Sequence, residues 1–206
     1  MLKILGRKNS SNVQKVIWAC EEMSLPFEQE DIGGPFGRNK DPEYLALNPN
    51  GTVPTIVEDG FSMWESNAIV RHLASRHGVG TLWPKDAHER AHADQWMDWQ
   101  QTVVNPALGP LFLNLVRLKP EQRDMNAVKA AREKTAAALA ILDRRLAKNN
   151  FVAGARFTMG DIPLGIATYR WFTMPIERED LPALKGWYDR LGERVAFRKN
   201  VMIGLT

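Results

Sequence analysis

Three polar side chains stand between the first apolar run of the chain and its first segment of helical spacing: Ser10, Ser11 and Asn12. A hydroxyl can donate a hydrogen bond, and the N-terminus of a helix carries partial positive charge. Together these two features can stabilise an anion such as a thiolate. The same side chains can also do no more than cap the helix. The turn is therefore a candidate for catalysis, with helix capping as the alternative interpretation.

Two further pairs, Val53-Pro54 and Glu65-Ser66, lie about a dozen residues apart on either side of the turn Asp59-Gly60. A proline can fix an ordinary turn, and a Glu-Ser pair can begin an ordinary helix. Each pair by itself can have either a purely structural role or a role in ligand binding. Their occurrence together around a hairpin signal favours a binding site.

The elements that must position these residues follow from hydrophobic periodicity. The first 80 residues mix short apolar runs with turn signals, which predicts the order β-α-β followed by β-β-α. The predicted elements are a strand at 2–5, a helix over 13–23, a strand at 27–32 parallel to the first, a hairpin of 55–57 and 61–64, and a helix from Ser66 to about Arg76. Pro26 ends the first helix, and Ser66 is predicted to cap the second.

The remainder of the chain is almost entirely helical in its spacing. Pro106 and Pro110 predict that residues 86–114 form one long helix or a broken pair. Further helices are predicted over 125–148, from Asp161 onward after a Thr158-x-x-Asp161 capping box, and over 181–194. This change in the spacing of apolar residues predicts an α/β domain over 1–78, a linker over 79–85 and an all-helical domain over 86–206.

Composition excludes several classes of protein. The 27 Lys and Arg are interleaved with 24 Asp and Glu, so the net charge of +3 indicates no nucleic-acid surface. No run of about 18 apolar residues occurs, so we expect no membrane span and a cytoplasmic location. Cys20 is the single cysteine and lies on the apolar face of the first helix, which predicts an inert buried thiol and excludes an intramolecular disulfide.

One motif points to metal chemistry. His88, Glu89 and His92 fit the pattern H-E-x-x-H, which places two imidazoles on one helical face. The motif follows a turn, lies among polar residues and lacks the downstream histidine of the extended zinc-protease motif. We therefore expect a solvated first turn of the long helix and no metal site.

The stretch LNPNGTVPTI at 47–56, followed by WESNAI at 64–69, resembles the glutathione-site signature of the cytosolic glutathione S-transferases. The similarity covers essentially the whole chain, from the Ser-rich turn to the Thr158-x-x-Asp161 box. It implies an N-terminal thioredoxin-like domain, an all-helical C-terminal domain and a homodimer. No tyrosine precedes Tyr44 and the turn lacks cysteine, so the resemblance is to bacterial-type members of a serine/asparagine class rather than a tyrosine class.

The resemblance assigns roles to individual residues. Val53, before a cis Pro54, would pair its backbone with the cysteinyl unit of glutathione, and Thr52 would add a contact. Ser66 and its helix N-terminus would bind the γ-glutamyl carboxylate, and Glu65 its ammonium. Lys40 falls where relatives hold the glycyl carboxylate.

The resemblance assigns activation of the glutathione thiol to the turn at residues 10–12. Ser10 matches the activating position of several classes, Asn12 is its expected partner, and Ser11 is the alternative. Trp96, Trp99 and Phe112 are candidates for the pocket of the second substrate, with interdomain core as their other interpretation.

The function implied is that of a glutathione transferase. Glutathione would be a co-substrate, with no permanently bound cofactor, and its thiolate would attack a small hydrophobic electrophile or a disulfide. A glutathione-dependent disulfide reductase or peroxidase is the alternative on the same fold. A non-catalytic binding or interaction module is the alternative of another class, which the polar residues at the predicted site disfavour.

Overall fold

A four-stranded mixed sheet organises the first part of the chain in the computed structural model, which describes residues 1–205. The strands are β1 (Leu2–Leu5), β2 (Phe27–Glu30), β3 (Thr55–Glu58) and β4 (Phe61–Trp64), in the spatial order β2-β1-β3-β4. β2 runs parallel to β1, whereas β3 is antiparallel to both β1 and β4. The predicted β-α-β and β-β-α order is confirmed.

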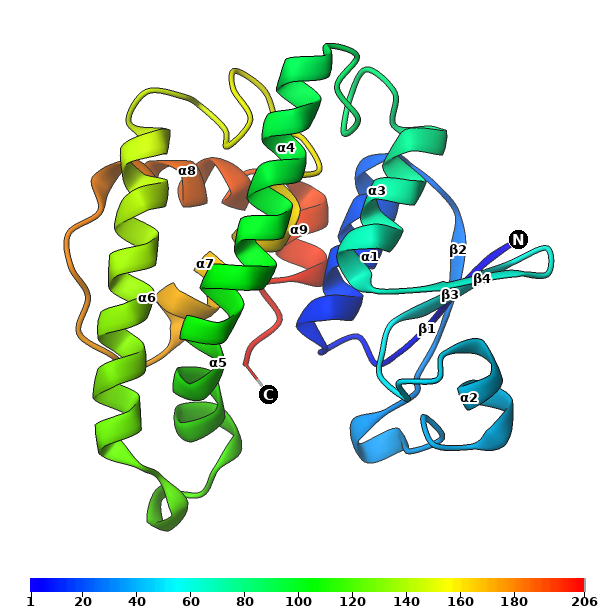
Figure 1. Ribbon diagram of the computed structural model, residues 1–206, viewed down its shortest axis with the longest axis horizontal. Coiled ribbons are helices and arrows are strands. Elements are labelled where there is room, and N and C mark those ends of the chain that lie inside the picture. The colour runs from blue at the N-terminus through cyan, green and yellow to red at the C-terminus, as the bar shows by residue number, and fades with distance from the viewer. Residues whose placement is uncertain (206) are drawn as a thin grey trace.

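Helices cover both faces of this sheet (Figure 1). On one face, α1 (Ser11–Glu22) and α3 (Ser66–His77) pack their apolar residues onto alternate residues of the strands. The buried core there consists of Leu2, Ile4, Val13, Val16, Ile17, Cys20, Ile56, Ile69 and Leu73. The short α2 (Pro42–Leu47) places Tyr44 against Leu5 and Ile32 in a separate small core.

The helix starts differ from the predicted ones by two residues in α1 and by one in α3, and these differences matter for the site. The N-cap position of α3 is Glu65 with a φ of +73°, and Ser66 is the first helical residue rather than the cap. α1 begins at Ser11, so Ser10 is its N-cap and Asn12 belongs to the first turn of the helix. All of these side chains therefore lie at helix N-termini.

The rest of the chain is helical: α4 (Ala87–Trp99), α5 (Asn105–Phe112), α6 (Met125–Leu146), α7 (Asp161–Thr173), α8 (Pro182–Gly192) and α9 (Val195–Asn200). The two prolines do not break the path between α4 and α5. Wider π-helical turns at Gln100–Val104 and Leu113–Arg117 keep the chain helical around Pro106 and Pro110. Together with the sheet domain, these helices confirm the predicted fold class.

Asp161 fixes the loop before α7. Its carboxylate is fully buried and accepts hydrogen bonds from Thr158 N at 2.9 Å, Val152 N at 3.0 Å and Trp187 Nε1 at 2.9 Å. Burial raises the pKa of Asp161 to about 6, and the hydrogen bonds oppose this shift. Asp161 is the first residue of α7, and Gly160 is the N-cap. Only half of the predicted capping box forms, because Asp161 N donates to the carbonyl of Thr158 and not to its hydroxyl.

α1 is the element through which the two halves meet. It packs on the sheet and α3 on one side and on α7 and α9 on the other. Asn67 Nδ2 of α3 also donates to Met97 O of α4 at 2.9 Å. The N-terminal ends of α1 and α3 consequently face the helical half of the molecule.

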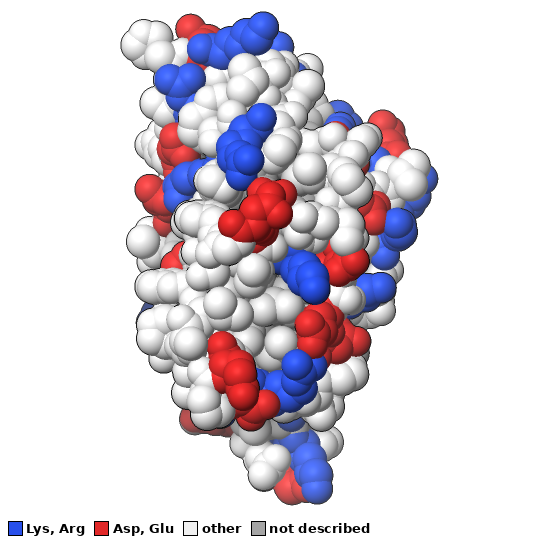
Figure 2. Space-filling view, turned by 90° about the vertical axis from the view of Figure 1, so that its right-hand side faces the viewer, with Lys and Arg blue, Asp and Glu red and all other residues white. Residues whose placement is uncertain are grey.

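The surface carries mixed charge. Figure 2 shows lysines and arginines interleaved with aspartates and glutamates on the face turned toward the viewer. Within residues 1–205, no helix is both long and apolar enough to cross a membrane.

Candidate active site

Ser10 is nearly buried, with 9% of its surface exposed, and its backbone is held in place. The backbone N of Ser10 donates to Arg7 O at 3.1 Å, and its carbonyl accepts from Gln14 N at 2.8 Å. Its side chain makes no capping hydrogen bond to α1, although it occupies the N-cap position. Capping therefore does not account for a serine at this position.

A chain of hydrogen bonds joins the starts of α1 and α3. Ser66 Oγ donates to Asn12 Oδ1 at 3.3 Å and accepts from Lys15 Nζ at 3.3 Å. Lys15 Nζ also reaches Gln100 Oε1 at 3.4 Å, in the π-helical turn after α4. The structure thus brings Asn12 and Ser66, two residues of the predicted site, into direct contact. It adds Lys15, which the sequence did not mark as a site residue.

Lys15 is almost completely buried, with 1% of its surface exposed. Burial lowers its pKa to about 7, assisted by the positive charge of Arg170 and opposed by the negative charge of Glu65. Lys15 follows Ser11 by four residues and so shares its helical face, which is the signal that could have identified it. Gln100 and Arg170 had no comparable signal, because they lie far from the predicted motifs in sequence.

The peptide bond between Val53 and Pro54 is cis, as predicted from the motif. Within residues 1–205, neither the N–H nor the C=O of Val53 is engaged in a backbone hydrogen bond. Gly6, at a φ of +151°, passes so close that an added Cβ would lie 3.0 Å from Val53 Cβ. The backbone of Val53 is therefore free to pair with an extended peptide.

Lys40 and Thr52, predicted to bind glutathione beside Val53, differ in how many of their polar groups are already hydrogen-bonded. Lys40 is exposed and extends over Gly51, where its Nζ lies 3.4 Å from Asn50 O. The carbonyl of Thr52 already accepts from Tyr44 Oη at 2.5 Å and from Asn48 Nδ2 at 2.8 Å. This leaves Thr52 its side chain and its N–H for a ligand.

Glu65 is exposed and holds a left-handed backbone conformation that non-glycine residues rarely adopt. Such a conformation costs on the order of 1–3 kcal/mol and often marks a functional position. The N–H groups at the start of α3 point the same way and have no partner within the helix. A carboxylate and a set of amide donors are thus presented side by side.

The candidates for the second-substrate pocket separate into two groups. Phe112 carries the guanidinium of Arg170 on its ring, with Cζ 3.9 Å from the centroid. Trp96 and Trp99 instead stack edge to face at 5.0 Å and pack against the core of the helical half. A narrow cleft of about 10 Å³ at Ser11 is also lined by Lys15, Asn105, Leu108 and Arg170. None of the three aromatic candidates lines this cleft, and Phe112 is linked to it only through Arg170.

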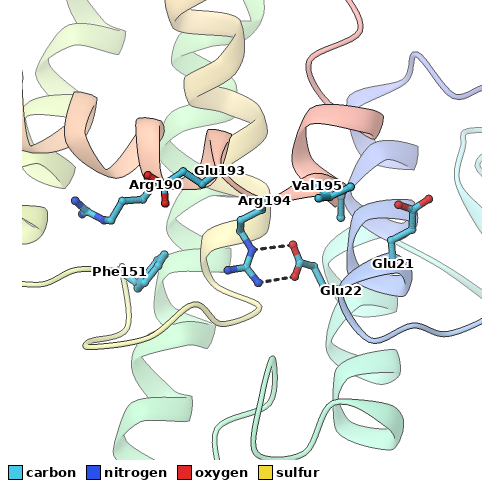
Figure 3. Close-up of a pocket in the computed structure, with 8 residues that line it drawn as sticks. Glu21, Glu22, Phe151, Arg190, Glu193, Arg194 and Val195 are labelled. Carbon is cyan, nitrogen blue, oxygen red and sulfur yellow. Dashed lines mark hydrogen bonds and ion pairs between the residues drawn. The ribbon is translucent and has the colours of Figure 1, made fainter.

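The larger cavities lie elsewhere. Volumes of about 450 and 440 Å³ adjoin the ion pair between Glu22 and Arg194, in which the Arg194 guanidinium engages both carboxylate oxygens (Figure 3). Glu22 is the last residue of α1, roughly 16 Å along the helix from Ser11. These cavities are separate from the residues that the sequence analysis selected.

The H-E-x-x-H residues lie on the first two turns of α4. His88 and His92 are exposed, and Glu89 forms an ion pair with Arg156 at 3.0 Å. Among the described residues, no group of three or more His, Cys, Asp or Glu is placed to hold a metal ion. Cys20 is buried, and burial raises the pKa of its thiol to about 12, as expected of an unreactive cysteine.

Comparisons with known proteins point to one family. The family model for the glutathione S-transferase N-terminal domain matches residues 9–76, and that for the C-terminal domain matches residues 125–190. Glutathione S-transferase GstB of Escherichia coli is 42% identical over the full length of both chains. Glutathione S-transferase 3 of Zea mays is 32% identical, covering 97% of this chain and 93% of its own.

Among solved structures, a theta class glutathione S-transferase from Xanthomonas axonopodis pv. citri with glutathione bound superposes with a TM-score of 0.96. It is 45% identical, and the match covers 100% of this chain and 99% of that one. The similarity thus extends over both halves of the molecule and the junction between them.

Proposed function

The chain belongs to the cytosolic glutathione S-transferase superfamily and is a glutathione transferase, and we propose that it activates the glutathione thiol at the N-terminus of α1. Val53 supports the proposed binding mode most directly, because its unpaired backbone groups match the edge of an extended peptide. The cysteinyl unit of glutathione would pair there and direct its sulfur toward Ser10.

The two charges of the γ-glutamyl end would be bound at the start of α3. Its carboxylate would accept from the free N–H groups and from Ser66, and its ammonium would face Glu65. Lys40 would hold the glycyl carboxylate, and the side chain or N–H of Thr52 would add a contact. Asn12 and Lys15 would act indirectly, since both are hydrogen-bonded to Ser66.

Activation requires that the thiolate be stabilised over the thiol. A free thiol has a pKa of about 8.5, and lowering it by two units needs about 2.7 kcal/mol. The free hydroxyl of Ser10 and the positive end of α1 are the proposed sources of this energy, with Ser11 as the alternative donor. In place of a tyrosine-based mechanism, this assigns the protein to a serine/asparagine class.

The proposed reaction is nucleophilic substitution. The thiol proton passes to solvent, the thiolate forms a bond to an electrophilic carbon, and the leaving group departs with its electron pair. The proposal extends to a cytoplasmic homodimer that acts in detoxification, with domains at 1–78 and 86–206 joined by a linker at 79–85.

Calorimetry with glutathione at millimolar concentration tests the binding part of this proposal. We expect saturable binding that weakens when Glu65 is replaced by Gln, and absence of binding would contradict the proposal. Parallel assays with an aryl halide and with hydroxyethyl disulfide separate transferase from disulfide reductase activity. Faster normalised turnover of the disulfide would favour the reductase.

A further inference from the structure

Three arginines from distant parts of the sequence lie near enough to lower one another's pKa: Arg7, Arg117 and Arg170. Arg7 lies in the turn after β1, Arg117 ends the π-helical turn after α5, and Arg170 lies in the last turn of α7. The guanidinium carbons of Arg170 and Arg117 lie 3.9 and 5.5 Å from the centroid of the same ring, that of Phe112. Arg7 extends along the glycine turn at Gly33 and Gly34, where added Cβ atoms would meet its side chain at 3.4 and 3.0 Å.

The three charges act on one another. Burial lowers the pKa of Arg170 to about 10, and the positive charges of Arg117 and Arg7 contribute to the shift. Arg117 likewise contributes to a lowered pKa of Arg7, after burial. Such an arrangement of like charges is unfavourable unless an anion is shared among them.

This arginine cluster is connected to the catalytic turn at two points. The carbonyl of Arg7 accepts the hydrogen bond from Ser10 N. Arg170 lines the cleft that also contains Ser11, and its charge helps to lower the pKa of the buried Lys15. The cluster therefore borders the position at which the thiolate would attack.

Among residues 1–205, no acidic side chain pairs with the cluster. Within residues 1–205, no ion pair and no side-chain hydrogen bond engages Arg7, Arg117 or Arg170, whereas Arg71, Arg156 and Arg194 all bind carboxylates. Glu65 is the acid that acts on this region, through Lys15, and the proposed function assigns its charge to the ammonium of glutathione. Among the described residues, an excess of positive charge therefore remains after glutathione is bound.

We propose that this arginine cluster recognises the second substrate and that this substrate is an electrophile bearing a carboxylate or a comparable oxyanion. The inference rests on the proposed function, because it needs a thiolate held at Ser10 or Ser11. The ring of Phe112, which is buried, supports two of the guanidinium groups. Both carboxylates of glutathione have other proposed partners, at α3 and Lys40, which leaves the cluster free for the second substrate.

A matched pair of aryl halides tests the inference. A chloronitrobenzoate and the corresponding chloronitrobenzamide differ in charge and little in shape, and both lose chloride when the thiolate attacks the ring. Each kcat/KM is divided by the rate of the uncatalysed reaction with glutathione. We expect the carboxylate to be favoured by about tenfold or more, the effect of one charge-assisted contact worth about 1.4 kcal/mol.

Arg117→Gln is the informative variant, because Arg117 is exposed and its loss leaves the core intact. We expect it to reduce the preference for the carboxylate over the amide about tenfold, through a lower kcat/KM for the carboxylate. Lys119→Gln removes an exposed positive charge two residues away and is the matched control, with the preference retained.

The outcomes separate this inference from the proposed function. Equal turnover of both substrates overturns this inference but not the proposed function. The same holds if the preference for the carboxylate is unaffected by Arg117→Gln and by the Arg7→Gln/Arg117→Gln double variant. A raised KM for glutathione in these variants, with the preference unchanged, assigns the cluster to glutathione and also overturns it. Turnover of neither substrate, nor of other aryl halides, contradicts the proposed function itself.

Discussion

Lys15 Nζ lies 3.3 Å from Ser66 Oγ, so a lysine buried in α1 holds the hydroxyl at the start of α3. The contact spans 51 residues of sequence and joins the two helix N-termini at which the thiol and the γ-glutamyl group of glutathione are proposed to bind. Lys15 also reaches Gln100 across the junction with the helical half. The geometry of the proposed site therefore depends on one buried amine.

The first prediction concerns pH. The pKa of Lys15 is about 7 in the folded protein, below its ordinary 10.5, so between these values the unfolded chain binds a proton that the folded protein does not. Stability consequently rises with pH in this window, by about 2.3 kcal/mol between pH 7 and pH 9 from this group. Urea unfolding at the two pH values should show that Lys15→Met abolishes this rise.

Lys129→Met is the matched control for that experiment, because Lys129 is an exposed lysine on α6. Its removal should leave the pH dependence of the wild-type protein in place. If the free energy of unfolding of Lys15→Met still rose with pH as in the wild-type protein, the amine of Lys15 would not titrate in this range.

Ser66→Ala should weaken glutathione binding. The variant removes a donor to Asn12 and an acceptor for Lys15, and it deprives the γ-glutamyl carboxylate of its proposed hydroxyl partner. A loss of about 1–2 kcal/mol raises the Kd roughly tenfold, measurable by calorimetry. Ser75→Ala on the same helix, whose hydroxyl binds His72 O, should keep the wild-type Kd; equal effects in both variants would exclude a specific role for Ser66.

Asp161→Ala should destabilise the protein strongly. Three donors, Thr158 N, Val152 N and Trp187 Nε1, would lose their buried acceptor, at about 1 kcal/mol or more each. Asp124 caps α6 at an exposed position, so Asp124→Ala should cost only about 1 kcal/mol. Comparison of the two free energies of unfolding checks this, and similar values would contradict a central structural role for Asp161.

Cys20 should be inert in the folded protein. Its pKa of about 12 reduces the thiolate fraction near pH 8 by about three orders of magnitude relative to an exposed thiol. Labelling with an aromatic disulfide should be slow in buffer and stoichiometric in urea. Rapid labelling of the folded protein would reopen a cysteine-based mechanism.

The strands, the hairpin and most long helices could be predicted because their periodicity is local. β1, α1 and the turn at Asp59-Gly60 each carry a strong pattern within a dozen residues. α2 escaped prediction because it has only six residues, and α9 was missed for the same reason. The π-helical turns depend on how the helix accommodates Pro106 and Pro110, which periodicity does not encode.

The site could be predicted where a motif carries it and not where tertiary packing builds it. The cis bond at Pro54 and the pair Glu65-Ser66 lie in one continuous stretch. Lys15 shares a helical face with Ser11, but a lysine in an amphipathic helix normally faces solvent, so the spacing does not mark it as buried. The arginine cluster combines residues 7, 117 and 170, and only the folded chain brings them together.

The pKa of the thiol of bound glutathione tests the central claim most directly. It can be followed through the ultraviolet absorbance of the thiolate while calorimetry confirms that glutathione stays bound. In the wild-type protein we expect a pKa about two units below the free value of about 8.5, and in Ser10→Ala a return to above about 8. Activation by this turn would be contradicted if the thiol pKa of bound glutathione stayed low in Ser10→Ala, in Ser11→Ala and in the double variant.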